Sequence, residues 1–292
     1  MNYTISTFYC FIELPEKELP KIKAELLAIL LQNQIKGTIL VATEGINSTI
    51  CGDAVALQTA ISEIKSYLQC DFPQTISESP IDPFPKAKVR IKPALVKMLD
   101  EKRNLAALKP HEIGEYVVPE KWNDLISQKD VIIIDARNSY ETHLGKFKGA
   151  VDPNTRKFNQ LSDFTNGKIA KDAKIATYCT GGIRCERYSA WLKAEGYTNV
   201  YHLQGGILKY LQDIPEESSL WEGSCYVFDD RVAVKHGLEV DETTTSCLAC
   251  GHSLIARELQ SEKYVYGKSC PHCETYPPSN FDLLECAKLK DL

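Results

Sequence analysis

The stretch YCTGGIRCE, residues 178–186, decides how the central part of this chain folds. It closes the apolar run 175–179, which is typical of a buried strand, and it precedes a segment with Ala190, Trp191 and Leu192 that we expect to be helical. A cysteine at the end of such a strand lies at the sheet edge where α/β folds bind their ligands. Cys179 is therefore the first candidate for chemistry.

The residues around Cys179 favour a thiolate. Two glycines allow backbone N–H groups to turn toward the sulfur, and a helix N-terminus and Arg184 add positive charge. We therefore predict Cys179 and Arg184 as the catalytic pair, and we set aside a buried structural role for Cys179. The predicted active-site loop is Thr180, Gly181, Gly182 and Ile183. Cys185 either resolves a Cys179 persulfide as a disulfide or packs under the helix.

Apolar runs at 131–135 and 200–203 accompany the run before Cys179. Such runs are typical of parallel strands buried on both faces and separated by helices. Residues 120–215 therefore predict a parallel α/β domain that holds the thiol loop. Within it we expect Asp135 and Arg137 to form a structural ion pair.

The first part of the chain has a different pattern. A β-branched and aromatic run, 3–13, precedes apolar residues at helical spacing; strands at 38–42 and 48–51 follow, then a helix capped by Asp53. The alternation in 88–98 predicts the last strand, after a Pro-rich stretch, 73–85. This β-α-β-β-α-β order predicts a ferredoxin-like, acylphosphatase-like sandwich over residues 1–115, with one sheet face free for ligands.

A linker with Pro110, Gly114 and Pro119 separates these two domains, and residues 216–292 form a polar, cysteine-rich C-terminal module. The module contains two C-x-x-C pairs with nineteen residues between them: Cys247, Cys250, Cys270 and Cys273. This spacing predicts a structural zinc site with four thiolate ligands and no open position for a substrate. The alternatives are a ligand role for His252 or His272, or a redox dithiol.

Composition limits the classes of function. The chain has 292 residues, 43% of them hydrophobic, and a net charge of −5, so no overall positive field attracts nucleic acid. The start of the sequence does not resemble a signal peptide, and no apolar run is long enough to span a bilayer. We expect a cytoplasmic protein without membrane contact, whose eleven cysteines serve as ligands and reagents rather than disulfides.

The thiol loop resembles the active-site loop of the rhodanese family. The matching loop residues are Cys179, Gly182 and Arg184. The flanking motifs follow the family's order: DAR at 135–137, Glu141, HLGKFKGAVDPN at 143–154 and LQGG at 203–206. A tyrosine phosphatase loop needs five residues between cysteine and arginine, whereas this loop has four. Four residues are too few for the same wrap around a phosphate, so we do not expect phosphatase activity.

The whole chain resembles the bacterial tRNA uridine-34 hydroxylase family, through YCTGGIRCE, SCPHC at 269–273 and ATEGINSTICG at 42–52. The resemblance implies hydroxylation of the wobble uridine to 5-hydroxyuridine, with tRNA as partner, molecular oxygen as co-substrate and Cys179 as catalytic cysteine. The sequence contains no recognisable oxygen-activating site and does not indicate the oligomeric state. The alternative is a sulfurtransferase that passes sulfur from a Cys179 persulfide to a small acceptor, a protein or tRNA. A non-catalytic adaptor ranks last because the loop keeps its cysteine.

Five cations lie on and around one predicted strand of this acidic protein. They are Lys86, Lys88, Arg90, Lys92 and Lys97. We predict that the first four contact tRNA phosphates. The alternative is an edge strand whose cations keep it solvated and prevent edge-to-edge pairing.

Overall fold

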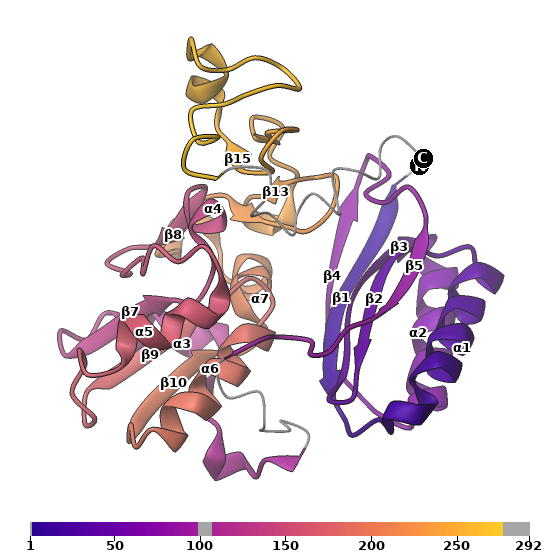
Figure 1. Cartoon of the computed structure of the whole chain (residues 1–292), viewed down its shortest axis with the longest axis horizontal. Helices are drawn as coiled ribbons and strands as arrows, with labels where there is room; N and C mark the ends of the chain where they lie inside the picture. Colours follow the sequence, from indigo (N-terminus) through magenta and orange to yellow (C-terminus); the bar gives the residue numbers. More distant parts are fainter. Residues whose placement is uncertain (1, 99–106, 277–292) are drawn as a thin grey trace.

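The computed structural model describes residues 2–98 and 107–276 (Figure 1). The end of the predicted first domain, 99–106, and the last part of the predicted C-terminal module, 277–292, lie outside the described residues. An N-terminal sheet with two helices lies beside a central parallel sheet, and a C-terminal segment lies against the central domain. No described helix is both long and apolar enough to cross a membrane.

The N-terminal domain contains a five-stranded sheet in the order β4-β1-β3-β2-β5. Its elements are β1 (Tyr3–Phe11), α1 (Leu19–Gln32), β2 (Lys36–Ala42), β3 (Gly45–Gly52), α2 (Ala54–Leu68), β4 (Gln74–Ser79) and β5 (Ala87–Ile91). All pairings are antiparallel except β2 with β5. The first four strands have the ferredoxin-like arrangement, which confirms the predicted fold.

Both helices pack on one face of this sheet, the face that points away from the central domain (Figure 1). Leu26 and Leu30 of α1 and Leu57 and Ile64 of α2 are fully buried there, at the helical spacing expected from the sequence. The Asp53 carboxylate accepts the N–H groups of residues 55 and 56 and so caps α2 as predicted. Within the described part of this domain, no helix covers the opposite face of the sheet.

The position of the fourth strand differs from the prediction. Residues 88–98 were expected to supply it, but β4 is formed by Gln74–Ser79, within the Pro-rich stretch 73–85 to which no strand was assigned. The prolines at 73 and 80 bracket this strand, and its polar sequence QTISES suits an edge strand that packs on one side only. Residues 87–91 form an additional edge strand, and Leu95 and Met98 beyond it pack into the core of the central domain.

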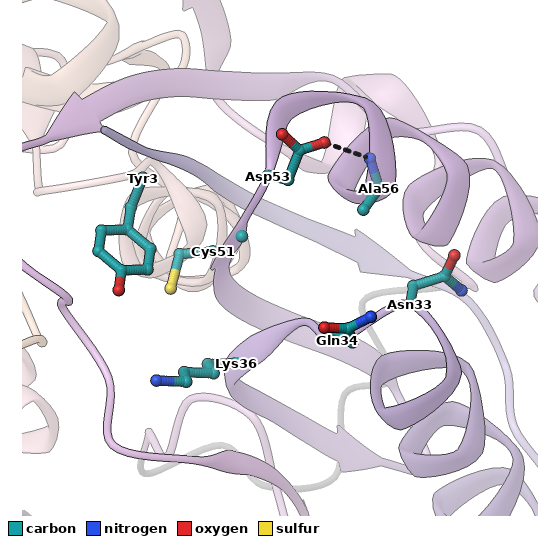
Figure 2. Close-up of a pocket in the computed structure, with 8 residues that line it drawn as sticks. Tyr3, Asn33, Gln34, Lys36, Cys51, Asp53 and Ala56 are labelled. Atoms are coloured by element: carbon teal, nitrogen blue, oxygen red, sulfur yellow. Dashed lines mark hydrogen bonds between the residues drawn. The ribbon is translucent and has the colours of Figure 1, made fainter. Parts of the chain in front are cut away.

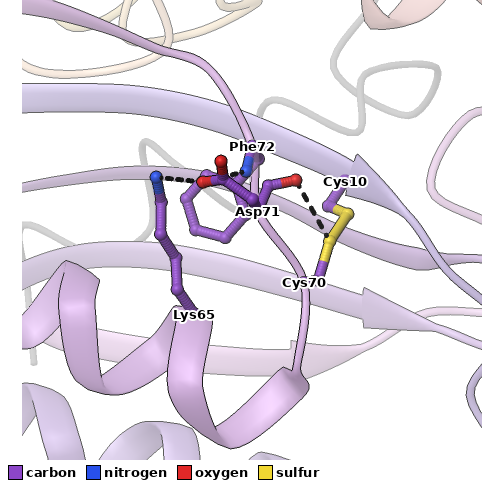
Figure 3. The surroundings of a disulfide bond; sticks show 5 residues. All are labelled: Cys10, Lys65, Cys70, Asp71 and Phe72. Atoms are coloured by element: carbon purple, nitrogen blue, oxygen red, sulfur yellow. Dashed lines mark hydrogen bonds and ion pairs between the residues drawn. A yellow bond between two sulfur atoms is a disulfide. The ribbon is translucent and has the colours of Figure 1, made fainter.

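The structure pairs Cys10 of β1 with Cys70 after α2 in a disulfide (Figure 3). Beside it Lys65 bonds Asp71 at 2.6 Å, and the rings of Phe8 and Phe72 stack with centroids 4.4 Å apart. This pairing contradicts the expectation that no cysteine serves as a disulfide partner. The two positions are 60 residues apart and become neighbours only when α2 returns to β1, so no local pattern indicates the pair.

The central domain contains a four-stranded parallel sheet in the order β6-β10-β9-β7. Its elements are β6 (Glu115–Val117), α3 (Pro119–Ile126), β7 (Val131–Asp135), α4 (Ser139–Thr142), β8 (Gly145–Phe147), α5 (Leu161–Thr165), β9 (Lys174–Tyr178), α6 (Ile183–Ala194), β10 (Asn199–Leu203) and α7 (Gly206–Asp213). The three predicted parallel strands are confirmed. The edge strand β6 was not expected, because it lies in the predicted linker.

The segment that follows α7 first completes the central domain. Strand β11 (Trp221–Gly223) pairs with β8, and Trp221 joins Phe147, Tyr178 and Tyr210 in one aromatic cluster. Four two-residue strands follow in two antiparallel pairs: β12 (Cys225–Tyr226) with β13 (Ala233–Val234), and β14 (Thr245–Ser246) with β15 (Ser253–Leu254). The 3-10 helices are η1 (Glu16–Glu18), η3 (Pro110–Glu112), η4 (Phe158–Gln160), η5 (Glu216–Ser218), η6 (His236–Leu238) and η7 (Ala256–Gln260).

The N-terminal sheet and the central domain meet through buried contacts. Arg187 of α6 forms an ion pair with Glu44 in the β2–β3 turn, and both side chains are nearly fully buried. Glu44 also accepts the N–H of Leu95. Losing one partner of such a pair would leave an uncompensated buried charge, which costs about 3–5 kcal/mol. The pair therefore fixes how the thiol loop, which precedes α6, faces the open side of the N-terminal sheet.

Candidate active site and metal centre

Cys179 lies directly after β9, and helix α6 begins four residues later. Its side chain is 0% exposed, and its sulfur accepts the N–H of Gly182 at 3.2 Å. Gly182 has φ +98°, a conformation that side-chain-bearing residues avoid. Gly206, at the start of α7, packs directly against the loop. A Cβ there would lie 2.5 Å from the carbonyl oxygen of Cys179, so a side chain at this position would clash with the loop backbone.

These surroundings make Cys179 acidic. Burial alone would raise the pKa of its thiol, but this is outweighed by a hydrogen bond from the Cys185 thiol, the charge of Arg184, and the N–H groups of Cys185 and Gly182. The pKa of Cys179 is lowered to about 6. The thiol is therefore mostly ionised at neutral pH, which is the nucleophilic form of cysteine.

Arg184 acts on the thiol while bound to another group. It forms a double hydrogen bond with the buried carboxylate of Glu141 on α4, at 2.6 Å for each pair of atoms, and also contacts the Thr180 hydroxyl at 3.1 Å. The sequence placed Glu141 only among flanking motif residues. In the structure Glu141 orients Arg184. The Arg184 guanidinium interacts electrostatically with two anions, the Glu141 carboxylate and the Cys179 thiolate.

Cys185 lies in the first turn of α6, close to Cys179, and its side chain is also fully buried. Burial and the charge of Cys179 raise the pKa of its thiol well above the ordinary value, so Cys185 keeps its proton and donates it in a hydrogen bond to Cys179. Both cysteines are free thiols in the structure. Cys185 is thus packed beside Cys179, where its hydrogen bond stabilises the thiolate; both predicted roles, packing and resolving a persulfide, fit this position.

Asp135 and Arg137 form the structural ion pair that the sequence predicts. Both side chains are 0% exposed, and the closest contact is 2.6 Å. Arg137 also donates to the carbonyl oxygens of Glu141 and Gly145. The pair thus holds β7 to the segment that carries Glu141, behind the thiol loop.

Three residues near the loop were not expected from the sequence. Tyr9 of β1 donates a hydrogen bond of 2.8 Å to Glu186 of α6, and Tyr116 of β6 bonds the same carboxylate. A Cβ on Gly182 would lie 3.2 Å from the Tyr9 hydroxyl, so this group borders the loop. Burial raises the pKa of Glu186, and the two tyrosine hydrogen bonds only partly offset this effect. The sequence could have indicated Glu186 through its position directly after the loop, whereas no feature of the sequence near Tyr9 indicated its role.

The open face of the N-terminal sheet is polar opposite the thiol loop. The register aligns Thr75, Thr7, Thr49, Thr38 and Lys88 in one row across the five strands. Arg90 occupies the next row, on the same face. A Cβ on Gly181 would lie 3.8 Å from the Thr7 methyl group, so the loop faces this row. Lys86 and Lys92 flank β5, which is an edge strand, as the alternative interpretation of these cations requires.

A cavity of about 370 Å³ lies at one end of the N-terminal sheet (Figure 2). Its lining includes Lys36, Cys51 and Asp53, and none of its lining residues belongs to the thiol loop. Burial and the charge of Asp82 raise the pKa of the Cys51 thiol to about 12, so this cysteine stays protonated. Lys36 is paired with Asp82. The cavity therefore lacks a reactive group, and Cys179 remains the candidate nucleophile.

The four predicted zinc ligands converge. The sulfur atoms of Cys247, Cys250, Cys270 and Cys273 all lie within 4.8 Å of one another. The distances from Cys247 to Cys273 and from Cys250 to Cys270 are 3.8 and 3.6 Å. Four sulfurs bound tetrahedrally about 2.3 Å from one zinc ion stand about 3.8 Å apart. The donor set thus fits a closed, tetrahedral zinc site.

The parallel sheet and the thiol loop at its carboxyl edge define a rhodanese-domain protein with an added ferredoxin-like domain. Family models agree: residues 3–95 match the UPF0176 acylphosphatase like domain, and residues 118–213 match the rhodanese-like domain.

Relatives identify the particular family. The chain is 44% identical over 275 residues to a tRNA uridine(34) hydroxylase of Acaryochloris marina, covering 91% of this chain and 84% of the relative. It is 42% identical to the protein of that name from Rhizobium leguminosarum, covering 93% and 86%, and 40% identical to that of Teredinibacter turnerae, covering 100% and 90%. The chain belongs to the tRNA uridine(34) hydroxylase family.

Proposed function

We propose that this protein hydroxylates uridine 34 of tRNA to 5-hydroxyuridine, with molecular oxygen as co-substrate and Cys179 as the catalytic residue. Family membership supports the reaction and the substrate. The observation that carries the role of Cys179 is its position in the loop: the sulfur accepts the Gly182 N–H, its surroundings lower the pKa of the thiol, and the loop faces the sheet of a second domain. A tRNA substrate implies a cytoplasmic location.

In this proposal Cys179 acts as a thiolate. The N–H of Gly182 and the hydrogen bond from Cys185 hold the negative charge at sulfur, and Arg184, oriented by Glu141, supports it at longer range. Glu186 has a raised pKa and borders the loop, so it can hold or release a proton beside the thiolate. Tyr9 fixes its position from the other domain.

The tRNA would approach between the two domains. A wobble base lies unstacked in its loop, so it can enter a pocket at little cost in stacking energy. The threonine row offers hydroxyl groups to the RNA backbone, and Lys88 and Arg90 on the same face offer positive charge to phosphates. We propose Lys86 and Lys92 as weaker contributors at the ends of β5.

We further propose that Cys247, Cys250, Cys270 and Cys273 bind a structural zinc ion. All four ligand positions are then thiolates, so the ion takes no substrate and stabilises the C-terminal module. The rival ligand His252 is engaged elsewhere, because its Nδ1 lies 2.7 Å from the Ser253 carbonyl oxygen and its ring stacks on His272.

Mass spectrometry of tRNA from cells that lack this protein tests the function. We expect 5-hydroxyuridine at position 34 to be lost under aeration, to be restored by the wild-type gene, and not to be restored by Cys179→Ser. The level of 2-thiouridine should stay unchanged. Loss of thiolation with normal hydroxylation would overturn the proposal and favour the alternative, a sulfurtransferase that uses a Cys179 persulfide.

A further inference from the structure

A second group of metal-ligating side chains lies between the central domain and the cysteine-rich module. It consists of His143, directly after α4, Glu258 in η7 and His272 between two of the clustered cysteines. The Nε2 atom of His143 lies 3.0 Å from one carboxylate oxygen of Glu258, and the Nε2 atom of His272 lies 2.7 Å from the other. All three donor atoms lie within 4.8 Å of one another.

Each separation joins a histidine nitrogen to a different oxygen of Glu258 and has the length of a hydrogen bond, and each also matches two ligands at right angles around one ion. Donor atoms about 2.1 Å from a metal and at right angles to each other stand about 3.0 Å apart. The side chains are 21%, 12% and 24% exposed for His143, Glu258 and His272, so an ion and its water ligands can reach them. The His252 ring stacks on His272 with centroids 3.9 Å apart and closes one side.

The donor chemistry differs from that of the neighbouring cysteines. Thiolates select zinc, whereas imidazole and carboxylate together suit the first-row divalent ions from manganese to zinc, and two histidines with one carboxylate leave coordination positions open. His272 connects the two sites, because its backbone N–H donates to the Cys270 sulfur at 3.3 Å. Folding of the cysteine cluster therefore positions His272.

We propose that His143, Glu258 and His272 form a second divalent-metal site, distinct from the four-cysteine site. An ion bound there joins the central domain, which supplies His143, to the module, which supplies the other two ligands. The same α4 segment carries Glu141, which holds Arg184 of the thiol loop, so the ion also restrains that segment. This inference does not depend on the reaction proposed above.

The test uses the full chain, loaded with one equivalent of zinc and then titrated with Co²⁺ in the absence of oxygen. We expect one further equivalent to bind, detected by calorimetry and by weak visible bands without the thiolate charge-transfer bands of a cysteine site. Glu258→Gln and His143→Gln should each weaken this second binding at least about tenfold, the loss that even an outer-shell change can cause.

The controls separate a lost ligand from a lost fold. Glu262→Gln changes an exposed carboxylate near η7 in the same way and should leave the second binding intact. Each variant must retain its first zinc, which reports an intact cysteine cluster. The proposal is wrong if the zinc-loaded wild type takes up no second ion from Co²⁺, Fe²⁺ or Zn²⁺, or if Glu258→Gln, with its first zinc bound, binds the second ion as tightly as wild type does. The three side chains would then form only a hydrogen-bonded bridge.

Discussion

The thiol loop and the cysteine cluster use the same side chain in opposite ways. At the loop, one sulfur carries the charge, because Cys185 keeps its proton and donates it to Cys179. In the cluster, four sulfurs lie within 4.8 Å of one another, so negative charge on one sulfur disfavours ionisation of the others. Burial raises the pKa of Cys250 well above its usual range, and the charges of the neighbouring thiolates raise it further.

The difference shows what makes a cysteine reactive. Cys179 has N–H donors and an arginine around it, which stabilise one thiolate without neutralising it. The largest influences on the pKa values of Cys247, Cys250 and Cys270 include no lysine or arginine. A bound metal ion would supply the positive charge that lets four thiolates coexist. One arrangement favours attack on a substrate and the other favours ligation.

The largest effect should come from Cys179→Ser. The change removes the ionisable sulfur and scarcely alters the volume, so we expect hydroxylation to fall at least about 1000-fold while the fold is kept. Activity on tRNA and circular dichroism measure the two parts. A bound zinc equal to that of wild type is the matched control. A folded variant that kept full activity would contradict the thiol mechanism and erase the distinction between the two sites.

Removal of two cluster cysteines should abolish metal binding at the cysteine cluster. We expect the wild-type chain to hold about one zinc at this cluster and Cys250→Ser with Cys273→Ser to lose it, because two thiolates cannot hold a structural ion. Hydrogen exchange should then rise in residues 245–276 more than in β7 and β9. Metal analysis of wild-type protein purified without chelator provides the check: no bound metal would contradict the site.

A smaller effect is expected from Arg184→Ala. Loss of the guanidinium should raise the pKa of Cys179 from about 6 by about one unit, the lower end of the effect of a neighbouring opposite charge. In wild type the thiolate is present above about pH 6, so activity should decline as pH falls through this value, and in the variant the decline should begin at a higher pH. The rate of thiol alkylation against pH measures both. Glu141→Gln is the matched variant: it leaves Arg184 less neutralised and should shift the pKa of Cys179 downward. An unchanged pKa in Arg184→Ala would give the arginine another role.

The smallest expected effect concerns RNA affinity. Replacing Lys88 and Arg90 with glutamine should reduce the slope of log affinity against log salt by about 1.4, since each contact with a single-stranded phosphate contributes about 0.7. Binding of an anticodon stem-loop at several salt concentrations measures this slope. Lys21→Gln with Lys23→Gln removes the same charge from α1, on the helix-covered side of the sheet, and should leave the slope unchanged. If both double variants behave alike, the cations of β5 only protect a sheet edge.

Short-range patterns in the sequence were sufficient for much of this protein. Three parallel strands, the ferredoxin-like order, the Asp53 cap and the two cysteine pairs follow from periodicity or spacing over a few residues. The thiol loop is equally local, because Cys179, Gly182 and Arg184 all lie within one strand-to-helix turn. The physical reason is that backbone dihedrals, helix caps and metal knuckles depend on near neighbours.

Only the tertiary structure decided the surroundings of these motifs. Tyr9 and Glu186 are 177 positions apart and meet because the N-terminal sheet docks on α6 through the Glu44–Arg187 pair. The position of β4 depends on pairing with β1, and His143 meets Glu258 across 115 positions. Such contacts are set by which buried faces and charges fit together, and chain connectivity leaves no local pattern for them. The sequence therefore determined the candidate catalytic thiol, whereas the packing of distant segments determined which groups surround it.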